Sequence, residues 1–153
     1  MPDEIDCLIL HALMDDSRLS LKALARVSGL SAPSVAERLR RLEERGVLTS
    51  YTVNVDARAF GYMLQAIVRI RPIAGRMHAV ERHIQSIPEF TECDKVTGED
   101  CFVARLSVKS MDQLDTILDT LSDQAETNTS IIKTTPVKRR LPPLATTLPR
   151  PGD

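Results

Sequence analysis

Aromatic residues are scarce in this chain of 153 residues: they make up 3% of it, and tryptophan is absent. Proteins that bind single-stranded nucleic acid stack its bases on aromatic side chains, so this binding mode is not expected here. No apolar run approaches the roughly 20 residues of a membrane-spanning helix. The formal net charge is only −1. Cysteines number three and have no CxxC spacing, which argues against a disulfide framework and a zinc site.

Recognisable catalytic motifs are also missing. The chain has no P-loop, no dinucleotide-binding fingerprint and no evident nucleophile–base pair. His78 and His83 lie five residues apart, about 140° round a helix, so they do not form a metal site. We therefore expect no enzyme, no metal and no cofactor. The acidic N-terminus does not resemble a signal peptide, and the cysteine usage fits a reducing compartment, so a cytoplasmic protein is expected.

The most informative segment is residues 20–46, which read SLKALARVSGLSAPSVAERLRRLEERG. Ser20 and Ser31 are suitable N-caps for two short helices, and Gly29 suits the turn between them. The second helix has an apolar stripe at i, i+4 and i+7, made of Val35, Leu39 and Leu42. This arrangement predicts a helix-turn-helix whose second helix can enter the DNA major groove.

Charge is concentrated on the same segment. Residues 18–45 hold seven basic and three acidic residues, a local excess of +4 in a nearly neutral chain, which suits contact with phosphates. The alternative is a solvated helix face with Glu–Arg pairs. In the DNA-binding interpretation, the residues that face the groove are Ser31, Ser34, Arg38 and Arg41. The residues that contact phosphates are Ser20, Lys22 and Arg40.

The chain divides near residue 60. Residues 1–50 predict three helices, a winged-helix-like helix-turn-helix domain. Residues 51–61 are expected to be strand and linker, because 47–55 alternate and are rich in β-branched residues. Residues 62–140 predict a second domain, and residues 141–153 a proline-rich tail that is extended or disordered.

The second domain has the pattern βαββαβ of a ferredoxin-like sandwich, which makes the whole chain α+β. Strands are expected at 64–71, 90–97, 101–109 and 127–137, with helices over 77–87 and 110–121. Two helices on one face leave the other face of the sheet in need of a cover. Its candidate apolar residues are Ile67, Val103 and Ile131. A second copy of the chain is the simplest cover, and a homodimer also suits a pseudo-palindromic double-stranded DNA site.

Several blocks carry a resemblance that covers most of the chain. They read IDCLILHAL, DDSRLSLKALARVSGLSAPSVAERLRRLEERGVL, SYTVNVDARAFGY, IPEFTECDKVTGEDCF and TSIIKTTPVK. In these blocks the chain resembles the Lrp/AsnC (feast/famine) family of bacterial and archaeal transcription regulators. The resemblance implies a DNA-binding domain, a regulatory domain that dimerises through its sheet, assembly of dimers to octamers, and control by amino acids.

The resemblance also implies an effector site near the turn after VTG. The candidate residues are Thr97, Gly98, Glu99, Asp100 and Phe102, with Thr127 and Thr129 on the last strand as further ones. Free backbone amides at a glycine turn suit a carboxylate, and the two acids could accept from an ammonium group. An ordinary tight hairpin is the alternative. Many family members read Gly-Asp-Tyr-Asp here, whereas this chain reads Gly-Glu-Asp-Cys.

We therefore predict a sequence-specific DNA-binding regulator of amino-acid metabolism or transport, controlled by an amino acid or a related small molecule. The alternative function is an enzyme of the siroheme decarboxylase type, which resembles the same two-domain plan. Few histidines and a basic second helix favour the regulator.

Overall fold

The computed structural model describes residues 1–144. The chain forms two compact units, one containing Met1–Val53 and the other Asn54–Lys138. Each unit has its own hydrophobic core. Of the predicted proline-rich tail, residues 141–144 form no helix or strand, and the remainder lies outside the described residues.

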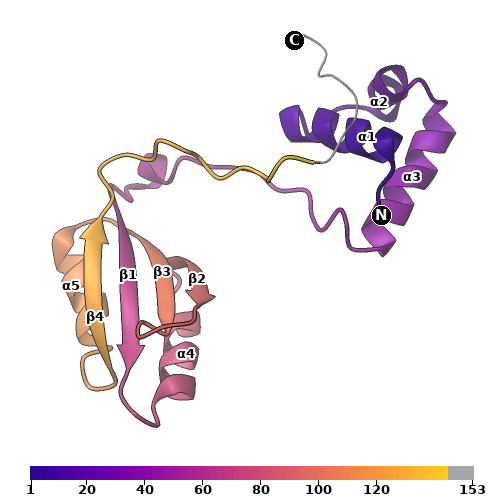
Figure 1. The fold of residues 1–153 in the computed structure, drawn as a ribbon. Coiled ribbons are helices and arrows are strands. Elements are labelled where there is room, and N and C mark those ends of the chain that lie inside the picture. The colour runs from indigo at the N-terminus through magenta and orange to yellow at the C-terminus, as the bar shows by residue number, and fades with distance from the viewer. Residues whose placement is uncertain (145–153) are drawn as a thin grey trace. The chain divides into compact units, whose positions relative to one another are not determined.

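Three helices make up the first unit (Figure 1): α1 (Glu4–Asp15), α2 (Leu21–Ser28) and α3 (Ala32–Glu44). Ser20 and Ser31 cap α2 and α3 as predicted. Gly29 ends α2 in the left-handed conformation, at φ +70°, which glycine adopts without a side-chain clash. The core consists of Ile9, Leu13, Leu24 and Val35. This unit is the predicted helix-turn-helix.

The predicted strand over 47–55 is absent. Residues 49–56 form no regular structure, and Tyr51, Val53 and Val55 are exposed. A strand needs a partner for its backbone groups, and none of the strands within residues 1–144 pairs with these residues. The wing implied by the winged-helix-like prediction is therefore not formed. A short 3-10 helix, η1 (Ala57–Phe60), follows.

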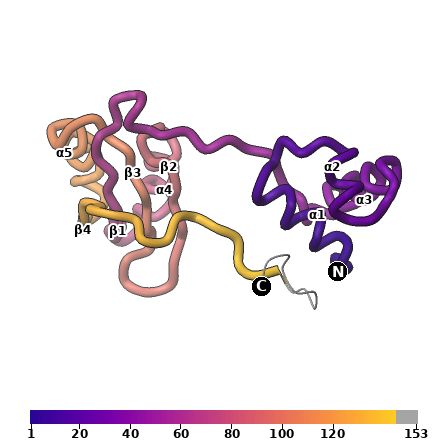
Figure 2. The backbone as a smooth tube through the Cα atoms, turned by 90° about the horizontal axis from the view of Figure 1, so that it is seen from above, coloured from indigo at the N-terminus to yellow at the C-terminus, as the bar shows by residue number. Residues whose placement is uncertain are grey.

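The second unit contains the predicted βαββαβ order: β1 (Leu64–Pro72), α4 (Met77–Ser86), β2 (Phe90–Lys95), β3 (Phe102–Val108), α5 (Met111–Asp119) and β4 (Ala125–Ile131). All pairings are antiparallel, and the strand order is β2-β3-β1-β4. β1 and β4 lie side by side in both views (Figure 1; Figure 2). β4 ends six residues earlier than predicted. Its ladder ends with Ile131 opposite Ala66, because only Leu64 and Gln65 of β1 lie beyond that pair, and one further hydrogen bond joins the Ile132 N–H to the Gln65 carbonyl.

Both helices cover one face of the sheet. Val80 of α4 and Leu114 of α5 pack with Ala66, Val68 and Leu106 of the strands in one buried core. The opposite face is open and carries the half-buried Ile67 and Val103. Ile131 was expected there, but it lies opposite Ala66, whose side chain faces the core. Cross-strand neighbours share a face. Ile132, whose N–H donates to the Gln65 carbonyl, therefore takes the place of Ile131 on the open face.

Candidate DNA-binding and effector sites

The serines of the helix-turn-helix lie at the two helix starts. Ser20 accepts from the N–H of Ala23 at 3.2 Å, and Ser31 accepts from the N–H of Ser34 at 3.3 Å. The Ser31 and Ser34 hydroxyls are also 2.8 Å apart. All three serines and Lys22 are exposed. The N-terminus of α3 thus presents hydroxyl groups beside the positive end of a helix dipole, which suits contact with DNA phosphates or base edges.

The arginines of α3 are partly neutralised within the helix. Arg40 donates to Glu37 at 2.9 Å and 2.7 Å and also contacts Glu44. These hydrogen bonds raise the pKa of Arg40 and lower that of Glu37. Arg41 lies 3.2 Å from Glu37, and its side chain is 61% exposed. Arg40 therefore forms the Glu–Arg pairs that the alternative interpretation expects on this helix face, whereas most of the Arg41 side chain stays exposed to solvent.

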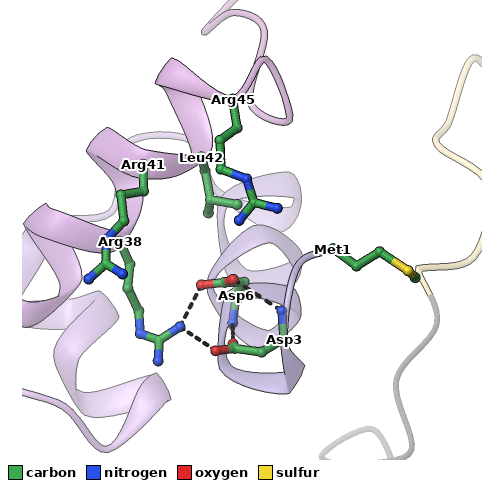
Figure 3. A pocket seen from close by; sticks show the side chains of 7 residues that line it. All are labelled: Met1, Asp3, Asp6, Arg38, Arg41, Leu42 and Arg45. Carbon is green, nitrogen blue, oxygen red and sulfur yellow. Dashed lines mark hydrogen bonds and ion pairs between the residues drawn. The ribbon is translucent and has the colours of Figure 1, made fainter.

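Arg38 lies at the border of the unit's core. The sequence placed it on the exposed face, but its side chain is only 26% exposed and points at the start of α1 (Figure 3). One guanidinium nitrogen, Nη1, donates to Asp3 and to Asp6, at 2.7 Å each. These residues line a small pocket of about 160 Å³ together with Met1, Arg41, Leu42 and Arg45. Its position on α3 explains this: Arg38 is about 40° from the buried Leu42 round the helix.

The hairpin between β2 and β3 carries the predicted effector residues. Its turn is tight: the Val96 N–H donates to the Cys101 carbonyl at 2.9 Å. Gly98 has φ +112°, a conformation that residues with a side chain rarely adopt. Thr97, Gly98 and Glu99 are exposed, and Asp100 is half-buried. The turn holds these residues together, as predicted, at one end of the sheet.

The acids of this hairpin face arginines on the open side of β1. Asp100 lies 3.7 Å from Arg69, and Glu99 lies 3.6 Å from Arg71. On β4, Asn128 accepts from Arg69 at 2.9 Å, and Glu126 pairs with Arg71 at 2.9 Å. The end of the sheet is therefore a network of alternating charges that joins two strands, β1 and β4, and the turn between β2 and β3.

Three of the predicted effector residues lie elsewhere. Phe102 is 2% exposed and packs in the core, so only its backbone can reach a ligand at the turn. Thr127 and Thr129 lie opposite Ile70 and Val68, so they share the face of those core-facing residues. The β4 residues that meet the hairpin's network are Glu126 and Asn128.

Sequence reasoning missed the partners that these sites contain. The sequence predicts an acidic N-terminus and a strand over 64–71, but it does not indicate which side chains Asp3, Asp6, Arg69 and Arg71 contact. The signal was available for β1, since two arginines on one face of a strand need counter-charges.

Among residues 1–144, no group of three or more His, Cys, Asp or Glu could hold a metal ion. In the same range, no helix is both long and apolar enough to cross a membrane.

Comparison with known proteins identifies both units. Residues 3–43 match the AsnC-type helix-turn-helix domain, and residues 65–142 match the Lrp/AsnC ligand binding domain. The HTH-type transcriptional regulator LrpC of Bacillus subtilis is 32% identical over 85% of this chain and 90% of its own length. LrpA of Mycobacterium tuberculosis is 33% identical over 83% of this chain and 85% of its own length.

Solved structures agree with these matches. The structure of B. subtilis LrpC superposes with a TM-score of 0.85 at 30% identity, covering 91% of this chain and 99% of LrpC. A feast or famine regulatory protein of M. tuberculosis, complexed with L-methionine, gives 0.80 at 32% identity, covering 91% of this chain and 97% of that one. These relatives are regulators and not enzymes, so the decarboxylase alternative has no counterpart among them. The chain belongs to the Lrp/AsnC family of DNA-binding transcription regulators, with an N-terminal helix-turn-helix unit and a C-terminal ligand-binding domain.

Proposed function

We propose that this protein regulates genes of amino-acid metabolism or transport by inserting α3 into the major groove of a pseudo-palindromic site. The observation that carries the proposal is the exposed stripe of Ser34 and Arg41 on the second helix of a helix-turn-helix. Ser31 shares the groove side at the start of α3. Ser20, Lys22 and Arg40 contact phosphates, and Arg40 must exchange Glu37 or Glu44 for the phosphate to do so.

A homodimer is proposed as the binding species, with further assembly to an octamer. The open face of the sheet supports dimerisation, because Ile67, Val103 and Ile132 are apolar and no helix covers them. A two-fold axis then presents two copies of α3 to two half-sites one helical turn apart. Such a protein acts where the DNA lies, in the cytoplasm.

We propose that the effector is an amino acid that binds at the β2–β3 hairpin. Thr97 and Gly98 present backbone N–H groups to its carboxylate, and Glu99 and Asp100 accept from its ammonium group. The relative that is complexed with L-methionine makes methionine the first amino acid to test. Arg69 and Arg71 compete for the same two acids at 3.6–3.7 Å, so an ammonium group must displace them.

A gel-shift titration tests the proposal. The purified chain is titrated against DNA from upstream of its own gene and against a scrambled control, with and without each amino acid, at two salt concentrations. We expect a shift restricted to the upstream fragment and changed by one amino acid. Equal binding to both fragments that vanishes at the higher salt would reduce the function to non-specific phosphate contact.

A further inference from the structure

The start of α1 is tied to the middle of α3 by a three-residue ion cluster made of Asp3, Asp6 and Arg38, called here the α1–α3 clamp. Asp3 is the N-cap of α1 and forms a capping box with Asp6. Asp3 Oδ1 accepts from the Asp6 N–H at 2.8 Å, and Asp6 Oδ2 accepts from the Asp3 N–H at 3.1 Å. Each carboxylate therefore uses one oxygen to cap its own helix.

The remaining oxygens of the two carboxylates bind Arg38. Asp3 Oδ2 and Asp6 Oδ1 both accept from Arg38 Nη1 (Figure 3). Asp6 is the least exposed of the three side chains, at 11%, and Arg38 is 26% exposed. Ion pairs that water reaches poorly are weakened less by solvent and salt than surface pairs are. The Asp6 N–H and then Arg38, as hydrogen-bond donors, lower the pKa of Asp3, and the hydrogen bonds to Asp3 and Asp6 raise the pKa of Arg38.

An Arg38 that reads a base must first leave this cluster. It would give up two charge-assisted hydrogen bonds of 2.7 Å and leave two carboxylates without their cation, next to DNA phosphates. Leaving a partly buried carboxylate unpaired carries a desolvation cost in addition to the lost bonds. Arg41 has a smaller obstacle, because the ion pair that it forms within residues 1–144 is with Glu37 of its own helix, at 3.2 Å.

We propose that Arg38 is a positioning residue of the DNA-binding unit: through Asp3 and Asp6 it fixes the rotation and height of α3 against α1. It then decides how well Ser34 and Arg41 meet their bases without touching DNA itself. The inference rests on the proposal that α3 enters the major groove. It replaces the sequence-based prediction that Arg38 contacts a base.

The test is a mutant cycle at Arg38 and Asp6 of the full chain. The variants are Arg38→Met, which keeps the apolar stem, Asp6→Asn, which keeps the shape, and the double variant. Arg41→Met, alone and combined with Asp6→Asn, is the matched control, since it removes a guanidinium whose ion pair is with Glu37 of the same helix. Affinity is measured by fluorescence anisotropy for upstream and scrambled DNA over a range of salt, at a temperature where circular dichroism gives native helix content.

We expect Arg38→Met and Asp6→Asn to lower affinity for the upstream DNA by a similar factor, about tenfold. The double variant is no worse than either single one, because all three break the same cluster. Binding to scrambled DNA and the salt dependence stay unchanged. Arg41→Met also weakens upstream binding, but without coupling to Asp6→Asn.

Other outcomes overturn the inference. If Arg38 touches DNA, Arg38→Met weakens binding while Asp6→Asn leaves it equal or tightens it, because the arginine is then released towards the DNA. If the clamp only stabilises the fold, both variants keep full upstream affinity when folded. If Arg38→Met does not fold, the affinities of Asp6→Asn and Arg38→Lys for the upstream DNA test the inference instead. Arg38→Lys is then expected to retain part of the wild-type affinity. A wild-type chain that does not prefer the upstream DNA contradicts the proposed function instead.

Discussion

At the scale of single residues, the three arginines of α3 and Arg45 at its C-cap differ in the acidic side chains that they contact. Arg38 forms ion pairs with two aspartates at the start of α1. Arg40 pairs with two glutamates of its own helix, and Arg41 with one glutamate, at 3.2 Å. Arg45 lies at the C-terminal end and is exposed. The net positive charge of this segment therefore does not equal the number of cationic side chains that are available to contact DNA. We therefore propose Arg41 as the arginine of this helix that reads guanine through a bidentate pair.

Arg41→Ala is predicted to lower the affinity for the specific site by ~1–3 kcal/mol and to relax the base preference at one position of each half-site. The measurement is a gel-shift titration against the upstream DNA and a set of single base-pair variants of it. Arg82→Ala, an exposed arginine of α4 in the other unit, is the control. An Arg41→Ala protein that binds every fragment as the wild type does would remove Arg41 from the reading residues.

The carboxyl of Asp3 makes the first unit sensitive to acid. Hydrogen bonding by the Asp6 N–H and by Arg38 lowers the pKa of Asp3 in the folded state. Its stabilising contribution is therefore present above the unfolded pKa of about 3.9 and is lost as the pH falls through the lower folded value. Urea-unfolding midpoints, followed by helical circular dichroism from pH 7 to pH 3, should fall less steeply for Asp3→Asn than for the wild type. The exposed Asp3 side chain keeps the difference small, and identical curves would show that the clamp adds no stability.

At the scale of elements, each helix of the DNA-binding unit starts at a capping side chain. For α3 the cap is Ser31, whose hydroxyl accepts from the Ser34 N–H and lies 2.8 Å from the Ser34 hydroxyl. The cap therefore holds both the first turn of the recognition helix and the side chain that we propose to face the groove. Pro33 in the same turn loses nothing by lacking an N–H, since the first amides of a helix have no intrahelical partner.

Ser31→Ala is predicted to destabilise the chain by ~1 kcal/mol, because the first turn of α3 loses its cap. The free energy of unfolding from urea titration measures this. Ser50→Ala, at an exposed position outside any helix or strand, should change it little. The same loss in both variants would mean that the cap contributes nothing of its own.

The elements were largely predictable because their signals are local. Caps, the Gly29 turn and apolar periodicity indicated the five α-helices of residues 1–144, and the expected βαββαβ pattern indicated the four strands of the sheet. The strand over 47–55 failed because a β-branched pattern cannot supply a partner strand. Arg38 was misplaced because its partners lie 32 and 35 residues away in sequence. The hairpin was found, but Arg69 and Arg71 were not, since only the strand order brings β1 beside it.

At the scale of the whole molecule, we propose that the open sheet face governs assembly. It presents Ile67 and Ile132, with Arg105 and Ser130 beside them, along a groove that the chain after β4 also lines. Apolar side chains in this setting favour a covering surface. A second sheet of the same kind supplies one, and the two-fold axis it creates repeats the DNA-binding unit.

Ile67→Glu is predicted to convert the proposed dimer to a monomer, because the interface would lose an apolar side chain and would have to take a charged one out of water. The monomer itself should fold, since position 67 is half-buried on the open face and is not part of the core under the helices. Light scattering coupled to size-exclusion chromatography gives the mass. The control is Met111→Glu, at an exposed position of α5 on the other side of the unit. A dimer that survives Ile67→Glu would place the interface elsewhere.

The pairing of β1 with β4 has a consequence for the portability of the regulatory unit. The first strand enters and the last strand leaves the sheet as neighbours, with Ala66 opposite Ile131 and the Ile132 N–H bound to the Gln65 carbonyl. Domains whose ends meet in this way tolerate transfer into the loops of other proteins, because both splice points lie at one place on the surface. The ligand-binding unit can therefore be moved as one cassette, which would let a foreign protein acquire its response to a small molecule.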